Sequence, residues 1–468
     1  MSDPKKSNTV VIDIGKTHVK LHVLDNNFTS VFSSQMKNVV VASGDYPHVD
    51  IDGIWTWLTE HLKALKGRFV VNALTFTTHG ATAALIDRNN PDSSKSLVMP
   101  ILDYEFAGIA ELNQDYNALR PSYATTFSPN LPVGLNLGRQ LYWLQQSKPE
   151  DFANATDILM YPQYWVWRFT GQCYSEITSL GCHTDLWSIV ENRYSSLVSH
   201  MQIGHLFPPM KSAWFDCGTI LDDVAQQCEL TPDCRIFNGI HDSNASYLRY
   251  KLALDNDPFT VISTGTWTVL MSSQGELTHL DERKDMLANI DAMGAPVTCA
   301  RFMGGREFEA ICELAGSWLG EQFGETDIQN VLDLAVFALP DFSHGSGPFG
   351  GNRGCFVGPV DKVSGIALAT LYCALMIDYQ LDMLGAEGKV FIEGAFLKNP
   401  LLSGILSQLR DKQEVLLSLD STGTVYGAAQ LTNWQNNQCE VITEEATTTH
   451  LHKLAHYRDC WREMAAQQ

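Results

Sequence analysis

Two strand–turn–strand segments, one near the N-terminus and one past the middle of the chain, constrain the fold more than any other feature. The first joins the apolar run 10–15 to a second run at 19–25 through a small polar turn. The second covers 259–272 and has Ser-Thr-Gly-Thr at 263–266. Alternating apolar residues on both sides of a glycine-containing turn predict β-hairpins. Since the two hairpins share this chemistry, we expect two related halves.

The residues after each hairpin predict helices and strands that would complete two α/β domains. In the first half we expect a strand at 30–35, a helix at 54–66, a strand at 73–78 and a helix-rich, aromatic stretch at 140–232. In the second half we expect helices at 306–323, 366–384, 399–410 and 424–434, and strands at 389–393 and 414–419. Segment 366–384 is apolar on almost every side, which is typical of a buried helix.

Length and composition limit the classes of protein that this chain can belong to. A chain of 468 residues, 45% hydrophobic and 18% charged, has enough apolar material for two or three packed domains and is not disordered. A formal net charge of −21 disfavours a nucleic-acid-binding surface. Any polyphosphate would therefore be held by local backbone N–H groups and a metal ion.

The eleven cysteines form no Cys-x-x-Cys pair, so we expect reduced thiols and no zinc site. The first residues lead into a strand rather than a signal-peptide apolar region. No run of about twenty uninterrupted apolar residues is present, so no membrane span is expected. These features predict a cytoplasmic protein.

Two polar turns and one carboxylate are the first candidates for chemistry. Asp13, in the segment Asp13-Ile14-Gly15-Lys16-Thr17, could reach a metal ion while the turn donates to phosphate oxygens, although an ordinary hairpin turn would look the same. The 263–266 turn could approach a phosphate closely, but such turns are common. Asp242 follows an apolar strand, as a general base at a strand end would, and equally could cap the next helix.

A further glycine-containing segment, Glu393-Gly394-Ala395, joins a strand to a helix. A related pattern returns at 423–429. Glycines in these segments could let an adenine lie against the backbone, or could simply separate helix from strand.

The order of these motifs resembles the FGGY family of carbohydrate kinases over essentially the whole chain. Three more segments are similar to signposts of that family's sugar-binding domain: Thr78-His79-Gly80-Ala81, Leu102-Asp103-Tyr104-Glu105, and Pro162-Gln163-Tyr164 leading to Arg168-Phe169-Thr170-Gly171. The resemblance implies two ribonuclease-H-like (actin-like) α/β domains flanking a deep cleft. We place the sugar-binding domain at 1–245 and the nucleotide-binding domain at 246–468.

The resemblance also implies roles for individual residues. Asp242 would be the catalytic base and His79 and Asp103 would contact sugar hydroxyls. The residues expected to face ATP phosphates or Mg²⁺ in the first half are Asp13, Gly15, Lys16, Thr17 and Lys20, with Asp13 nearest the metal. The residues expected to hold the terminal phosphates or the adenosine in the second half are Thr264, Gly265, Thr266, Gly394, Ala395 and Asn399.

The chain departs from the family pattern at three places. Lys16 stands where many members have a small hydroxyl residue, and Glu105 where many have a basic or amide residue. Ala395 stands where a second glycine is usual. These departures affect the phosphate turn, the sugar contacts and the fit of the nucleobase, respectively.

The resulting hypothesis is an ATP- and Mg²⁺-dependent kinase that phosphorylates a hydroxyl of a small ketose or polyol, such as a pentulose or a deoxyhexulose. Closure of the two domains would exclude water. The alternatives are a catalytically inactive sugar- or nucleotide-sensing protein of the same fold and an actin-like phosphohydrolase. We expect a sugar and MgATP as partners, with no nucleic acid or membrane, and a homodimer is compatible with the aromatic content.

Overall fold

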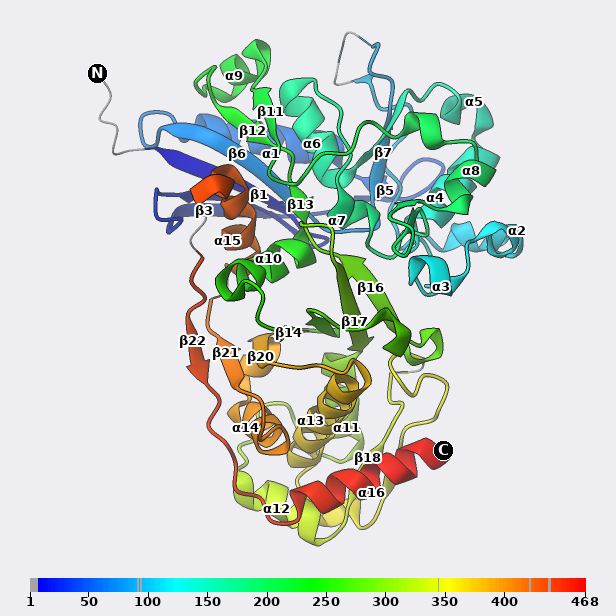
Figure 1. The fold of residues 1–468 in the computed structure, drawn as a ribbon, viewed down its shortest axis with the longest axis vertical. Coiled ribbons are helices and arrows are strands. Elements are labelled where there is room, and N and C mark those ends of the chain that lie inside the picture. Colours follow the sequence, from blue (N-terminus) through cyan, green and yellow to red (C-terminus); the bar gives the residue numbers. More distant parts are fainter. Residues whose placement is uncertain (1–6, 91, 93–94, 344, 421, 437–438) are drawn as a thin grey trace. The chain divides into compact units, whose positions relative to one another are not determined.

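The computed structural model describes residues 7–90, 92, 95–343, 345–420, 422–436 and 439–468 (Figure 1). The chain forms two compact units. The first contains Met1–Ala253, Asn289–Ala295 and Thr422–Cys439, and the second contains Leu254–Ala288, Pro296–Ser421 and Glu440–Gln468. A segment close to the C-terminus therefore folds with the N-terminal half. The functional division into 1–245 and 246–468 stays a prediction.

The sheet of the first unit begins with the expected N-terminal hairpin. Its strand order is β11-β12-β6-β1-β2-β3, and a short strand, β13, also pairs with β6. Strands β1, β2 and β3 are antiparallel neighbours, whereas β6 is parallel to β1, and β12 and β13 are parallel to β6. The bounds are β1 Asn8–Ile14, β2 His18–Leu24, β3 Ser30–Lys37, β6 Val71–Thr78, β11 Asp216–Thr219, β12 Arg235–Phe237 and β13 Ile240–His241.

The sheet of the second unit repeats this order. It runs β16-β17-β15-β14-β20-β21-β22, with an antiparallel β14–β15–β17 meander and with β20 and β21 parallel to β14 and to each other. Its strands are β14 Phe259–Thr264, β15 Thr268–Ser272, β16 Met286–Ile290, β17 Pro296–Phe302, β20 Lys389–Gly394, β21 Val415–Ser418 and β22 Thr443–Glu445. The shared strand order confirms the two related halves and the α/β fold class predicted from the sequence.

Helices cover the sheet of the first unit. Helix α1 (Ile51–Lys63) starts at Asp50, whose carboxylate accepts from the Gly53 N–H at 3.0 Å, and buries its apolar face. Helix α10 (Asp242–Leu254) follows β13 directly. Helix α15 (Gly423–Ala429) comes from the late segment and packs against β1 and β6 (Figure 1).

The glycines of helix α15 lie against α10, and this packing accounts for them without an adenine. A Cβ on Gly427 would lie 1.8 Å from the Ala245 carbonyl oxygen on α10, and one on Gly423 would lie 2.4 Å from the Arg249 guanidinium carbon. Both glycines therefore allow close packing of α15 on α10 within the first unit. The predicted helix at 424–434 is also shorter, because it ends at Ala429 and continues as the 3₁₀ segment η8 (Gln430–Asn436).

A helix-rich lobe in the first unit contains the predicted aromatic stretch. Trp143 is buried in the core of this lobe, and Trp165 and Trp167 are buried in the core of the main sheet, which leaves all three unavailable for pairing with another chain. Helices α6 Tyr161–Thr170 and α9 Asp222–Cys228 share the core of the main sheet with α1. The other elements of this half are β4 Val40–Val41, β5 His48–Val49, β7 Ala83–Ile86, β8 Asp157–Met160, β9 Trp187–Ser188, β10 Arg193–Tyr194, α2 Asn113–Leu119, α3 Tyr123–Thr126, α4 Leu137–Ser147, α5 Pro149–Phe152, α7 Ile177–Leu180 and α8 Ser196–His200.

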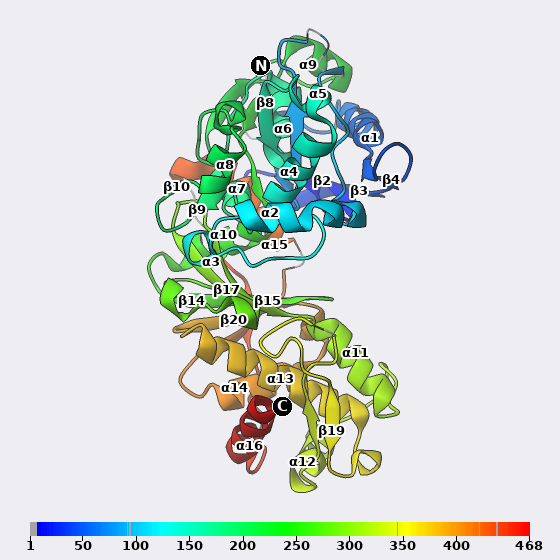
Figure 2. The same ribbon diagram turned by 90° about the vertical axis from the view of Figure 1, so that its right-hand side faces the viewer.

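The second unit packs its helices around α13 (Gly365–Met383), with α11 (Gly304–Leu314) and α14 (Pro400–Leu409) as neighbours (Figure 2). Helix α13 is long and apolar enough to cross a membrane by composition, but 83% of its apolar window is buried inside this unit. That burial confirms the predicted core helix. Helix α16 (Leu454–Gln467) joins it through Arg462, which donates to Asp378 at 2.6 Å. The remaining elements are α12 Glu325–Asp333, β18 Phe337–Leu339 and β19 Cys355–Val357.

Candidate active site

Three parallel strands of the first unit end at one edge of the sheet and carry three of the predicted site residues. Asp13 lies near the end of β1, opposite Thr77 of β6. His79 follows β6, and Asp242 follows β13, whose last residue pairs with Thr78. Carboxyl ends of parallel strands are a common place for ligands in α/β sheets. The pairing of β1, β6 and β13 therefore brings Asp13, His79 and Asp242 to the same edge of the sheet.

Asp13 is a buried carboxylate with a single lysine beside it. It is 6% exposed, and Lys20, directly opposite on β2, donates to it at 3.2 Å. Burial raises the pKa of Asp13, and the charge of Asp242 adds to this rise, while Lys20 opposes it. The two carboxylates are thus close enough to repel each other, which a bound cation would relieve.

Asp242 sits at the junction between β13 and α10 and can act on a bound hydroxyl. Its carboxylate accepts from the Ser243 N–H at 2.6 Å and the Ser243 hydroxyl at 3.2 Å, and 30% of the side chain is exposed. Desolvation raises its pKa, against the opposing effects of His79, Ser243 and Lys20. A carboxylate with a raised pKa is a stronger proton acceptor. A capping side chain accepts from an N–H two or three residues further along the helix, whereas Asp242 accepts from the adjacent Ser243. These contacts therefore do not favour the alternative in which Asp242 caps the helix.

Two histidines flank Asp242, and both are kept neutral. Burial lowers the pKa of His241 to about 4, and its Nε2 lies 3.2 Å from Asp242 Oδ1. Burial also lowers the pKa of His79. His79 Nδ1 lies 3.0 Å from the Gly80 carbonyl, so the neutral ring donates there and presents Nε2 as an acceptor. An acceptor of this kind suits a sugar hydroxyl.

Lys16 contacts Asp103, a predicted sugar-binding residue, and does not pair with Asp13. Its ammonium donates to Asp103 Oδ1, lies 3.4 Å from Glu105 Oε2, and stands 4.5 Å above the centre of the Tyr104 ring. Asp103 is 7% exposed. Gly15 and Thr17 form the turn beside it: the Gly15 N–H donates to the His18 carbonyl at 2.9 Å, and Thr17 is exposed.

A small pocket connects these side chains. Its lining includes Lys16, His79, Asp103 and four residues to which the sequence analysis gave no role: Tyr104, Thr82, Asn38 and Val39. Asn38 follows β3 and donates to the Gly15 carbonyl at 2.8 Å. Tyr104 could have been noticed because it lies between Asp103 and Glu105. Asn38 and Val39 carry no signal in the sequence, since they reach the pocket only through the pairing of β2 with β3.

The hairpin turn of the second unit also closes through the N–H of its glycine, but it is one residue shorter than the first. The Gly265 N–H donates to the Trp267 carbonyl at 2.9 Å. The Thr264 hydroxyl donates to the Glu393 carbonyl at 2.6 Å and accepts from the Phe396 N–H at 2.9 Å. Thr264 therefore fixes the loop after β20 in this conformation. Thr266 is exposed, so its hydroxyl can donate to a phosphate.

The first residues of α11 pack closely against this turn. The sequence analysis did not predict them as part of the site. A Cβ on Gly305 would lie 2.4 Å from the Gly265 carbonyl oxygen. No side chain caps the first turn of α11. Its N-terminal N–H groups can therefore add to the phosphate-binding capacity of the turn. The Gly304-Gly305 pair was the signal in the sequence that could have pointed to this contact.

The predicted adenosine loop lies beside the same turn. Gly394 has φ +89°, and a Cβ there would lie 2.1 Å from the Thr264 carbonyl oxygen, so only glycine fits. Gly394 and Ala395 are both exposed. Asn399 instead caps α14 by accepting from the Leu402 N–H at 3.3 Å, and it donates to the Thr370 hydroxyl at 2.9 Å. The structure thus assigns Asn399 a packing role, and its predicted adenosine contact stays a prediction.

Comparison with known families accounts for both units. Residues 8–248 match the N-terminal domain of the FGGY family of carbohydrate kinases, and residues 256–440 match its C-terminal domain. The chain belongs to the FGGY family of carbohydrate kinases. The enzyme class predicted from the sequence is the class of this family.

Individual FGGY proteins resemble the chain to different extents. A carbohydrate kinase structure from Novosphingobium aromaticivorans is 30% identical, with a TM-score of 0.90 and 99% of both chains covered. An L-fuculokinase from Salmonella typhi is 23% identical over 58% of this chain and 58% of its own length. A probable L-xylulose kinase from Pasteurella multocida is 22% identical over 59% of this chain and 57% of its own. The chain thus spans under two thirds of these two kinases.

FGGY kinases use ATP as the phosphoryl donor, and the residues of the second unit fit it. Gly394 is exposed and lies beside the turn that carries the exposed Thr266 hydroxyl. The carboxylates of the first unit show whether this chain could bind Mg²⁺. Among the described residues no group of three His, Cys, Asp or Glu side chains could hold a metal. Asp13, with Asp242 nearby, fits a Mg²⁺ ion carried mainly by phosphate oxygens.

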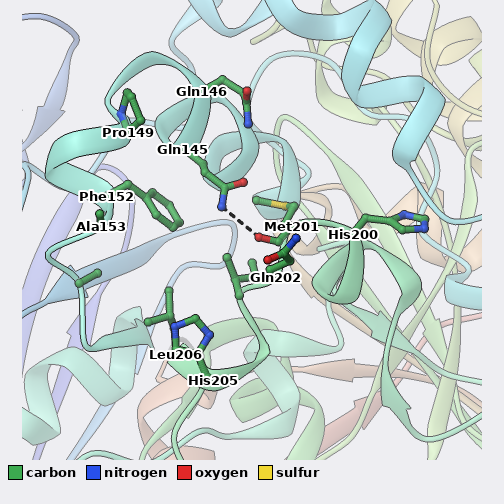
Figure 3. A pocket seen from close by; sticks show the side chains of 12 residues that line it. Gln145, Gln146, Pro149, Phe152, Ala153, His200, Met201, Gln202, His205 and Leu206 are labelled. Carbon is green, nitrogen blue, oxygen red and sulfur yellow. Dashed lines mark hydrogen bonds between the residues drawn. The ribbon is translucent and has the colours of Figure 1, made fainter.

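A separate pocket of about 480 Å³ lacks the charged groups that a kinase active site needs (Figure 3). It lies among α4, α5 and α8, where the Gln145 side chain donates to the Met201 carbonyl at 3.0 Å. Its twelve lining residues include two histidines but no Asp, Glu, Lys or Arg. It therefore offers neither a carboxylate base nor a fixed charge for a phosphoryl group.

Proposed function

We propose that this chain is an ATP-dependent kinase that phosphorylates a hydroxyl of a small ketose or polyol, with pentuloses and deoxyhexuloses as the first candidates. The observation that carries the proposal is the grouping of Asp242, Asp13 and His79 at one sheet edge beside a pocket that contains Asp103. The names of two relatives, an L-fuculokinase and a probable L-xylulose kinase, support the same classes of sugar.

In this proposal the first unit binds and activates the sugar. Asp242 accepts the proton of the attacking hydroxyl, and the N–H and hydroxyl of Ser243 hold its carboxylate in place. His79 Nε2 and Asp103 accept hydrogen bonds from other hydroxyls. A site that pairs buried polar groups with sugar hydroxyls rejects analogues that lack them.

The second unit would hold the nucleotide. Thr266, Gly265 and the start of α11 donate to the phosphates, and the adenosine lies along Gly394 and Ala395. For Lys20 and Asp13 of the first hairpin we propose contacts with a phosphate group or its metal ion. Mg²⁺, when bound, would neutralise charge on the phosphate oxygens. These residue roles rest on the contacts above and on the family.

The test is ADP release from MgATP, followed by a coupled assay, with a panel of neutral ketoses and polyols. We expect one sugar to stimulate ADP release well above the hydrolysis seen without sugar. Removal of Mg²⁺ by EDTA should abolish the stimulation, and added Mg²⁺ should restore it. If ATP binds but no sugar raises ADP release, the proposal fails and an inactive sugar- or nucleotide-sensing protein becomes the better interpretation.

A further inference from the structure

The two lysines of the first hairpin pair with different carboxylates. Lys20 donates to Asp13, whereas Lys16 donates to Asp103 and also lies 3.4 Å from Glu105. The sequence grouped both lysines with the phosphates. In the structure, Lys16 lines the pocket that also contains His79 and Asp103.

Lys16 and Glu105 are also the two residues at which the chain departs from its family pattern in this region. They lie 3.4 Å apart, and Lys16 is the shared partner of Glu105 and Asp103. The Glu105 backbone N–H also donates to Asp103 Oδ1 at 3.1 Å. The Lys16 side chain is 24% exposed and that of Asp103 only 7%, so their pair is shielded from water, whereas Glu105 is 64% exposed. The cation at 16 and the anion at 105 thus compensate each other. We call Lys16, Asp103 and Glu105 the ion-pair cluster.

The charges around the pocket favour one kind of ligand. Among its lining residues, Lys16 and Asp103 are charged. Outside the lining, Glu105 lies beside Lys16, Asp13 pairs with Lys20, and Asp242 follows β13 at the same sheet edge, so carboxylates outnumber ammonium groups in this region. His79 adds no positive charge, because burial keeps it neutral. A carboxylate on the substrate would have to compete with Asp103 and Glu105 for Lys16 and would be repelled by the remaining anions. A neutral hydroxyl meets no such penalty.

We propose that the ion-pair cluster is the specificity-determining element of the sugar subsite, with Lys16 donating to a sugar hydroxyl rather than to ATP, and with Glu105 excluding sugar acids. The proposal rests on the proposed function and names the acceptor as a neutral polyhydroxylated sugar. Lys16 carries three N–H donors, and Asp103 uses one of them. Asp103 keeps lone pairs for a second hydroxyl, so the pair can bind two neighbouring hydroxyl groups at once.

Titration calorimetry and initial rates on the full chain test this assignment. The probes are a neutral ketose that stimulates ADP release, the aldonic acid of the same chain length, and MgATP. For Lys16→Met we expect KM and Kd for the ketose to rise about 10- to 100-fold, because a hydrogen bond to a charged group is lost. KM for ATP should stay within about two-fold. For Glu105→Gln we expect kcat/KM for the aldonate to rise about two- to five-fold, a small change because Glu105 is exposed.

Two variants make the result interpretable. Lys66→Met removes a lysine that pairs with Glu229 on the surface of the same unit, and it should change none of these constants. Lys16→Arg keeps the charge beside Asp103 and should therefore recover part of the ketose affinity. If Lys16→Met lost affinity only because it misfolds, restoring the charge would not be the reason for a recovery.

Each outcome separates the inference from the function on which it rests. If Lys16→Met raises KM for ATP and leaves ketose binding unchanged, Lys16 faces the phosphates and the inference is wrong while the kinase stands. If wild-type protein prefers the aldonate, or Glu105→Gln leaves the discrimination unchanged, Glu105 does not select the acceptor. If wild-type protein binds no ketose and none stimulates ADP release, the proposed function and the inference both fail.

Discussion

Substitution of Gly427 tests whether helix α15 packs against α10 or lies against the nucleotide. Replacing it with alanine puts a methyl group 1.8 Å from the carbonyl oxygen of Ala245 and 2.7 Å from its carbonyl carbon. These are backbone atoms of α10, so the clash can be relieved only by moving the two helices apart. Overpacking of a tight site costs about 1–3 kcal/mol, and the rigid contact here puts Gly427→Ala at the upper end, about 3 kcal/mol.

The loss should appear as a lower melting temperature of the first unit. For a unit of this size each kcal/mol lowers Tm by about 2–4 °C, so Gly427→Ala should lower it by about 6–12 °C in calorimetry. Because α10 begins at Asp242, we also expect sugar turnover to fall. ATP affinity should be unchanged. Gly204→Ala is the matched control, since its added methyl would meet Val198 only at an ordinary 3.5 Å.

The opposite pattern would refute this reasoning. If Gly427→Ala melts like the wild-type protein but loses ATP affinity, the glycine lies against the nucleotide, as the sequence pattern first suggested. Loss of stability in Gly204→Ala to the same degree would show that the effect does not come from the α10–α15 contact.

Three further predictions follow from single contacts. Gly394→Ala, which combines φ +89° with a methyl 2.1 Å from the Thr264 carbonyl, should raise KM for ATP and leave sugar affinity unchanged; equal KM values would contradict it. His241 binds its proton only near pH 4 when folded but near 6.5 when unfolded, so unfolding free energy should fall by about 3 kcal/mol as pH drops from 6.5 to 4. His241→Gln should flatten this dependence in urea titrations. Because the pKa of Asp242 is raised, kcat/KM should fall on acidification with a midpoint above 3.8; a midpoint at or below 3.8 would mean that Asp242 is not the base.

Local patterns predicted the elements that local physics determines. Both hairpins were found because glycine turns interrupt alternating apolar runs, and α13 was found because it is apolar on nearly every side. The predicted helix 306–323 extended too far, since α11 ends at Leu314. Gly316, with φ +76°, is the stop signal that was overlooked.

Long-range contacts are the part that the sequence could not supply. Nothing near Gly423 or Gly427 shows that this segment returns to the first unit, because the contact depends on α10, far earlier in the chain. The pairing of Lys16 with Asp103 likewise joins residues 87 positions apart. Asp13 and Asp242 could be placed together only once the strands β1, β6 and β13 were seen to end at the same edge.

The most direct test of the account is single-turnover transfer of the γ-phosphoryl group from labelled MgATP to the stimulating sugar by Asp242→Asn. Asparagine keeps the size of the side chain and removes its capacity to accept the proton. The account predicts that ATP and sugar still bind and that the transfer rate falls about 10²- to 10⁴-fold. Transfer at the wild-type rate, with both substrates bound, would contradict the assignment of Asp242 as the base.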